Sequence, residues 1–273
     1  MVWVVIGAAT PAHAYSAKGY VTYVTDGDTV GVDVYGDGTK TPVHIRMGGI
    51  QTMEIGSAST TSDDACHARA AQVRMGQLVY HKVVTLTASK TSSSSMGRPI
   101  RYVFKDGVDI GAIMIKEGHA IPWASGAEDS RVERYARLAV TAASNGLKIW
   151  DKDTCGSGPS QSTPLSMSLR WDAEGDDRLN PNGEWMRVHN GGSSSMAIGG
   201  WKLRDSGLRW FTFPSWAKVP AKGYVTLYVG KGSDYGNTFH WDQSGPVFAN
   251  SIPDGGYLTD PRGDFRAHKI YFP

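Results

Sequence analysis

Four charged residues near the start of the chain have the types and the order that phosphodiester hydrolysis needs. They are Asp28, Arg46, Glu54 and Arg98. The Asp28 carboxylate can hold a hard cation through oxygen, and Glu54 can orient or deprotonate a water. Two arginines can bind a phosphate and stabilise the charge that it gains as water attacks. Each residue alone has an ordinary structural explanation, but the ordered set indicates a phosphodiesterase.

The elements expected around these residues form a small barrel with helices. Alternating apolar and polar residues around the Asp26-Gly27 turn predict a hairpin. Strands are expected over 19–35 (the two arms of the hairpin), 42–47, 83–88 and 98–104. Helices are expected over 61–79, with caps at Thr61, Ser62 or Asp63, and over 109–117 and 130–144. The serine-rich segment 91–95 is expected to be a mobile loop. Five strands and three helices in this order predict an α+β OB-fold barrel, which often binds nucleic acid.

Residues 19–150 resemble the thermonuclease family, the staphylococcal-nuclease-like phosphodiesterases. The resemblance is carried by Asp26-Gly27-Asp28-Thr29-Val30, the spacing from Arg46 to Glu54, Gly97-Arg98, Glu117-Gly118-His119-Ala120 and Gly146-Leu147-Lys148-Ile149-Trp150. It implies an OB fold and calcium-dependent cleavage of DNA and RNA to 3′-phosphate products.

The resemblance also implies a role for each site residue. Arg46 and Arg98 correspond to the two arginines that stabilise the transition state. Glu54 corresponds to the general base or water-positioning residue. Asp28 corresponds to a calcium ligand, and the backbone carbonyl of Thr52 to a second one.

Two positions depart from the family pattern, and one aromatic residue is added to the site. Gln51 stands where a second calcium-binding aspartate is usual, and Met53 stands where a proline is usual. The Gln51 amide oxygen can still coordinate a cation, so we expect weaker calcium binding. Trp123 is a candidate for stacking on a base; the alternative is packing at the end of the barrel.

The hydrophobic pattern of the chain changes after a Gly-, Ser- and Pro-rich linker over 156–164. Residues 165–273 show short alternating strands separated by turns, which predicts an all-β, Ig-like sandwich. They resemble the lamin-tail domain through Asn182-Gly183-Glu184-Trp185-Met186 and Gly200-Trp201-Lys202-Leu203-Arg204-Asp205. That family implies no catalytic residue. We expect this tail to be dispensable for chemistry, to present substrate or bind a cell-surface or cell-wall ligand, and to bury its tryptophans in the sandwich core.

Composition limits the remaining possibilities. The 273 residues suffice for two domains, and a net charge of +2 does not support a nucleic-acid grip built on bulk charge. No apolar stretch approaches the ~20 residues of a membrane span.

Residues 1–14 end in Ala12-His13-Ala14 and predict the remnant of a signal peptide, with an apolar first strand as the alternative. Cys66 and Cys155 form a disulfide if the chain is exported; two unrelated buried thiols are the alternative.

These observations predict a secreted, monomeric, metal-dependent nuclease acting on DNA and RNA with little sequence preference. Its expected parts are the signal-peptide remnant 1–14, the thermonuclease-like domain 15–155, the linker 156–164 and the sandwich 165–273. Two alternatives stay open. One is a degenerate nuclease fold that binds nucleic acid or protein, and the other is a surface-adhesion protein.

Overall fold

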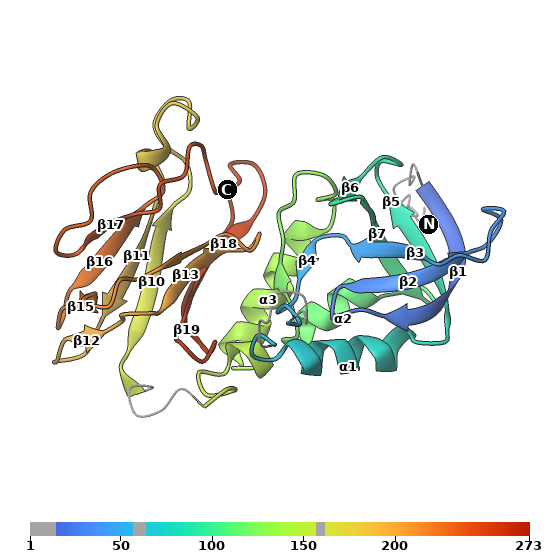
Figure 1. The fold of residues 1–273 in the computed structure, drawn as a ribbon, viewed down its shortest axis with the longest axis horizontal. Helices are drawn as coiled ribbons and strands as arrows, with labels where there is room; N and C mark the ends of the chain where they lie inside the picture. Colours follow the sequence, from blue (N-terminus) through green and yellow to red (C-terminus); the bar gives the residue numbers. More distant parts are fainter. Residues whose placement is uncertain (1–14, 57–63, 157–161) are drawn as a thin grey trace, which may run out of the picture.

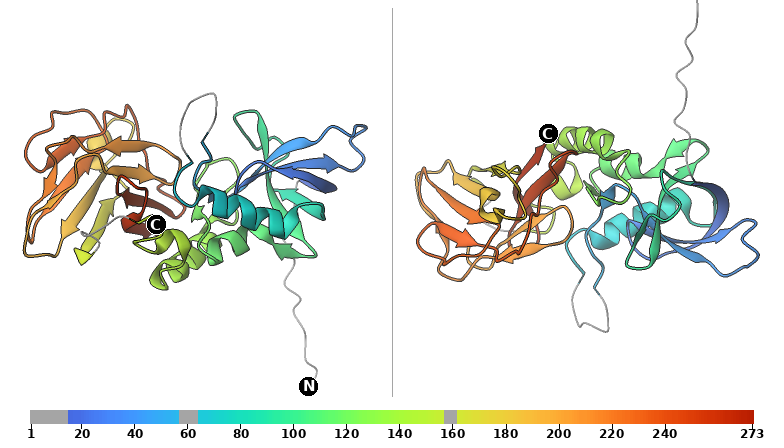
Figure 2. Two further views of the ribbon diagram at one scale, coloured as in Figure 1. Left: turned by 60° about the horizontal axis from the view of Figure 1, so that its bottom comes forward. Right: turned by 90° about the horizontal axis from the view of Figure 1, so that it is seen from above.

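A computed structural model describes residues 15–56, 64–156 and 162–273, which form two lobes side by side (Figures 1 and 2). The expected signal peptide over 1–14 and most of the expected linker lie outside the described residues. Within the described ranges, no helix has the length and apolar character needed to cross a membrane.

The first lobe is a closed barrel. Its strands are β1 (Tyr15–Val24), β2 (Thr29–Val34), β3 (Val43–Met47), β5 (Val83–Ala88) and β7 (Arg98–Lys105). They neighbour one another in the order β3-β2-β1-β5-β7, and β3 also pairs with β7 in parallel, which closes the barrel. Apolar residues at alternate positions, such as Val30, Val32 and Leu86, are fully buried, as period-two patterning requires. The predicted OB fold is confirmed.

Three helices accompany the barrel, as predicted. They are α1 (Ala68–Val79), α2 (Ile110–Lys116) and α3 (Val132–Ser144). The helix predicted from residue 61 begins at Ala68, and the caps proposed at 61–63 lie outside the described residues. Its N-cap is His67, which has φ 70° and makes no side-chain capping bond. By contrast, the Asp109 carboxylate caps α2 by accepting a hydrogen bond from the Ala112 N–H at 3.0 Å.

Short pairings connect the loops of this lobe. They involve β4 (Ile50–Gln51) with β9 (Ile121–Pro122), and β6 (Ser94–Ser95) and β8 (Val108–Asp109) with β7; a short helix, η1 (Lys148–Trp150), follows α3. The segment 91–95, expected to be a mobile loop, ends in a short hairpin arm at Ser94–Ser95, and only its first three residues lie outside a strand. Ser93 ties it down by donating a hydrogen bond to the Ala127 carbonyl at 3.0 Å.

The second lobe is the predicted sandwich. One sheet contains β10 (Leu165–Arg170), β11 (Trp185–Asn190), β16 (Tyr224–Tyr228) and β17 (Thr238–His240). The other contains β14 (Trp210–Thr212), β13 (Lys202–Asp205), β18 (Asp254–Thr259) and β19 (Phe265–Tyr271). Smaller elements are η3 (Pro181–Gly183) and the pair β12 (Met196–Ala197) and β15 (Lys218–Val219). Trp201 is buried in the core as expected, but the expectation is wrong for Trp210 and Trp216, each 52% exposed.

The two lobes share a hydrophobic core. Trp150, at the end of the first lobe, packs against Tyr257, Phe265 and His268 of β18 and β19, with ring centroids 4.8–6.1 Å apart. Figure 1 shows these strands at the edge of the sandwich that faces the barrel lobe. Because Tyr257 and Phe265 are buried with the barrel core, removing the sandwich would expose apolar surface on the first lobe.

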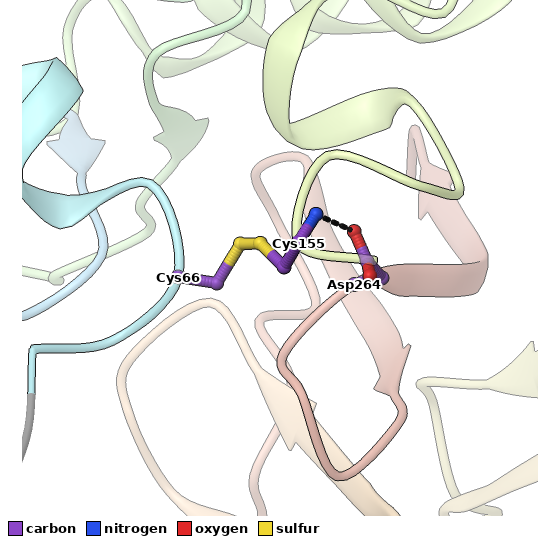
Figure 3. A group of neighbouring side chains, drawn as sticks. All are labelled: Cys66, Cys155 and Asp264. Atoms are coloured by element: carbon purple, nitrogen blue, oxygen red, sulfur yellow. Dashed lines mark hydrogen bonds between the residues drawn. A yellow bond between two sulfur atoms is a disulfide. The ribbon is translucent and has the colours of Figure 1, made fainter. Parts of the chain in front are cut away.

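A disulfide between Cys66 and Cys155 reinforces this contact and confirms the predicted pairing; the two Cα atoms are 6.0 Å apart. The Cys155 N–H also donates to the Asp264 carboxylate of the second lobe at 2.7 Å (Figure 3). The disulfide thus fixes the end of the first lobe, and the tail is held against that lobe by packing and by this hydrogen bond.

Candidate active site

The residues predicted to carry chemistry come from four neighbouring loops at one end of the barrel. Asp28 lies in the turn between β1 and β2, and Arg46 lies near the end of β3. Gln51 ends β4 and is followed by Thr52 and Glu54, while Arg98 begins β7. A local contact shapes the first turn: the Asp26 carboxylate accepts a hydrogen bond from the Asp28 N–H at 2.9 Å.

Asp28 joins the first turn to the segment after β4. Its Oδ2 accepts hydrogen bonds from the Thr52 N–H at 2.8 Å and from the Thr52 hydroxyl at 3.2 Å. Its Oδ1 lies 3.3 Å from Arg46 Nη1. Asp28 and Arg46 are each only 3% exposed, so their ion pair is shielded from water and its geometry is fixed by further hydrogen bonds.

Arg46 is held on all sides. Its Nη1 donates to the carbonyls of Met47 and Ile50 at 2.7 and 2.9 Å, and its Nη2 donates to Gln51 Oε1 at 2.7 Å. The guanidinium carbon lies 4.4 Å from the ring centroid of Trp123. Trp123 therefore covers Arg46 through a cation–π contact. For this residue the sequence suggested only stacking on a base or packing at the end of the barrel.

Gln51 connects Arg46 to Glu54. While its oxygen accepts from Arg46, its Nε2 donates to Glu54 Oε1 at 2.7 Å and to the Thr52 carbonyl at 2.9 Å. One side chain thus sets the positions of a cation and a carboxylate. Desolvation, and then the charge of Asp28, raise the pKa of Glu54, and the bond from Gln51 partly offsets the rise.

Arg98 is the most loosely held of the four charged residues. Its Nη1 lies 3.4 Å from Thr29 Oγ1 and its Nε lies 3.5 Å from the Ser95 carbonyl, and both contacts are weak by hydrogen-bond geometry. Thr29 in turn donates to Asp28 Oδ1 at 3.2 Å. Arg98 therefore borders the same cluster and can turn toward a ligand with little loss of bonding.

Asp26 belongs to this cluster and was not predicted as a site residue. Burial, together with the nearby charges of Asp28 and Glu54, raises its pKa to about 7. Its position two residues before Asp28, in the same Asp-Gly-Asp turn, could have identified Asp26 as a site residue from the sequence.

The cluster offers carboxylate oxygens, the ligands that hard divalent cations prefer, although the ligand atoms of Asp26, Asp28 and Glu54 do not all lie within 4.8 Å of one another. Asp26, Asp28 and Glu54 interact repulsively, with Arg46 as the buried ion-pair partner of Asp28. A cation bound by carboxylate oxygens would relieve that repulsion. Asp28 and Asp26 are the best-placed holders, and Thr52 offers its carbonyl. The Gln51 oxygen is occupied by Arg46 in this arrangement.

Comparison with known families agrees with both resemblances. Residues 44–152 match the family described as Staphylococcal nuclease homologue, and residues 172–268 match the Lamin Tail Domain. No curated protein matches the chain. The first match begins after β2, so the Asp26–Asp28 turn joins the site through its geometry and not through the matched segment.

Proposed function

Because the chain joins a staphylococcal-nuclease-like domain to a lamin tail domain, we propose that it is a secreted, monomeric nuclease. It would hydrolyse phosphodiester bonds of DNA and RNA with little sequence preference and leave 3′-phosphates. The disulfide suits an oxidising compartment, which supports the proposal of export.

The observation that carries the proposal is the continuous link from Arg46 through Gln51 to Glu54. It fixes a buried cation beside a carboxylate that faces a solvent-filled cleft. A module that only bound nucleic acid would gain nothing from a negative charge held beside a phosphate, so the link argues against the degenerate fold.

Each residue then has a chemical task. Glu54 accepts a hydrogen bond from the attacking water and takes its proton as the new P–O bond forms. Arg46, fixed before substrate arrives, and Arg98, free to close on it, stabilise the charge on the phosphate oxygens while the bond to the 5′-oxygen breaks. Trp123 keeps Arg46 in place. Calcium, held by Asp28 with Asp26 and the Thr52 carbonyl, would supply positive charge that polarises the phosphate.

A plasmid-nicking assay with calcium or with chelator tests the proposal. Arg46→Ala, Glu54→Gln and Arg98→Ala should each lower the rate by about 10² to 10³ while the melting temperature stays close to wild type for Arg98→Ala. The wild-type protein should be inactive in chelator. Undiminished cleavage by all three variants would exclude this site, and nucleic-acid binding without cleavage under any divalent cation would favour the degenerate fold.

A further inference from the structure

A cleft between the two lobes opens directly onto the candidate active site. The cavity measures about 540 Å³ and has Met53 and Glu54 in one wall, a size typical of ligand sites. The opposite wall comes from the tail: Lys202 and Arg204 of β13, Trp210 of β14, and Arg262 in the turn between β18 and β19. The tail therefore borders the catalytic carboxylate.

Arg204 is a buried cation that makes no salt bridge among the residues that the structure describes, although the charges of Asp205 and Glu54 act on it from a greater distance. It is 5% exposed, its Nε donates to the Asp205 carbonyl at 3.0 Å, and its Nη1 contacts Met53 Sδ at 3.8 Å. Its Nη2 is buried with no hydrogen-bond partner in the described part of the chain. The adjacent Asp205 carboxylate is already paired with Arg209 at 2.6 Å. Since an unpaired buried charge is costly, this guanidinium calls for an anion in the cleft.

Two of the three acidic residues that line the cleft are engaged elsewhere. Asp64 pairs with Arg69 at 2.5 Å. Asp260 accepts hydrogen bonds from the backbone of its own turn and pairs with Arg266 at 3.3 Å. The third, Glu54, accepts a hydrogen bond from Gln51 through Oε1, and its charge also acts on Arg204. Lys202 and Arg262 of the tail wall form no salt bridge among the described residues, so they are the cations left to meet a ligand.

An exposed aromatic residue accompanies these cations. Trp210 is 52% exposed, and Lys202 Nζ lies 4.8 Å from its ring centroid. Arg262 lies on the same wall and is exposed. Cations interleaved with an exposed aromatic ring are the pattern by which proteins hold single strands, with phosphates on the cations and a base on the ring.

The tail also contacts the site on its other side. Gly207, in the loop between β13 and β14, packs against Trp123: a methyl group added there would lie 3.5 Å from the indole nitrogen. Trp123 covers Arg46. The β13–β14 hairpin therefore touches both the cover of the catalytic arginine and the cleft beside the catalytic carboxylate.

We propose that this cleft binds the single-stranded stretch of DNA or RNA next to the scissile phosphate. Arg204 and Arg262 contact its phosphates, and Trp210, with Lys202 beside it, stacks on an unpaired base. The inference rests on the proposed nuclease function and assigns part of the substrate site to the lamin tail domain.

The first test measures binding in the Glu54→Gln background with calcium, using the anisotropy of a labelled 12-nucleotide single strand. The triple variant Lys202→Ala/Trp210→Ala/Arg262→Ala should raise Kd about tenfold. Loss of the phosphate contact of Arg262 should also reduce the slope of log K against log salt by about 0.7. The matched control is Lys218→Ala/Trp216→Ala, because Trp216 is 52% exposed like Trp210 but does not line the cleft.

A second test uses Arg204→Met, which keeps the volume of the side chain and removes its charge. With folding verified by thermal melting, this variant should lower kcat/KM for the 12-mer relative to a dinucleotide by about tenfold, the scale of one charged contact. Unchanged binding and an unchanged ratio would overturn the proposal, as would equal weakening of duplex and single strand by the triple variant. If the wild type cleaves neither substrate but the triple variant still loses binding, the nuclease function fails and the cleft assignment stands.

Discussion

Replacing Gln51 with leucine separates the function of this residue as a connector from a function as a metal ligand. The substitution places an apolar side chain of similar size in a position that is 3% exposed. It removes the acceptor for Arg46 Nη2 and the donor to Glu54, each at 2.7 Å. Both lost partners are charged, so the change falls on the two groups that the proposed mechanism uses.

The size of the effect follows from the Glu54 contact. A hydrogen bond to a charged group contributes about 1.5–3 kcal/mol, so losing the orientation of Glu54 should lower kcat about 10- to 150-fold. Arg46 keeps its bonds to the Met47 and Ile50 carbonyls and its ion pair with Asp28. We therefore expect a smaller change in substrate affinity than in turnover.

Steady-state cleavage of a fluorescent oligonucleotide across a calcium titration measures both quantities. The expected result is a lower kcat at saturating calcium. Gln77→Leu on α1 is the control, since that exposed glutamine accepts only a 3.2 Å bond from Arg74 and should leave kcat unchanged. A Gln51→Leu protein with normal kcat but a higher calcium requirement would refute the connector function and identify position 51 as a ligand.

Three further predictions concern metal, covalent and pH effects. Gln51→Asp adds a carboxylate to the cluster and should lower the calcium concentration for half-maximal cleavage, measured by the same titration. Cys66→Ser/Cys155→Ser opens an 89-residue loop and should cost about 2–4 kcal/mol in urea unfolding; an unchanged midpoint would contradict it. Burial raises the pKa of Glu184 from 4.5 to about 7, so stability should fall as pH rises from 4.5 to 7 and then level off, by on the order of 3 kcal/mol. Glu184→Gln should reduce that fall by about this amount without abolishing it, because the pKa of Asp26 is also raised to about 7; a profile as steep as that of the wild type would contradict the prediction.

The barrel strands were predictable because they depend on local patterns, and the structure brings the predicted site residues together, whereas their catalytic roles stay predictions. The strand over 83–88 has the predicted limits, since its apolar alternation is uninterrupted. The start of α1 was predicted wrongly because the prediction relied on a capping side chain. In the structure the helix is preceded by His67, which has a left-handed backbone conformation and makes no capping hydrogen bond. The serine-rich segment was misjudged because composition does not reveal the pairing of Ser94 with Pro99.

The contacts between the lobes could not be read from the chain. Arg204 lies 150 positions after Glu54, and as a residue in an alternating strand it is indistinguishable from an exposed one. Its burial depends on how Trp150 docks on β18 and β19. The expectation that the tail is dispensable for chemistry rested on the absence of a complete phosphate site within the tail; it stays a prediction, and the structure adds that tail residues line one wall of the cleft.

The nearly balanced charge of the chain limits how it can bind a nucleic acid. A net charge of +2 leaves little long-range attraction for a polyanion, so affinity must come from a few short-range contacts. In the first lobe Arg46 is buried and fully engaged, which leaves Arg98 as the main mobile cation of the cluster. Docking of the tail places further cations within reach of the same phosphate chain. Because Cys66 itself lines the cleft, the disulfide anchors the first-lobe wall of the cleft, and its removal should weaken single-strand binding before it affects the chemistry at Glu54.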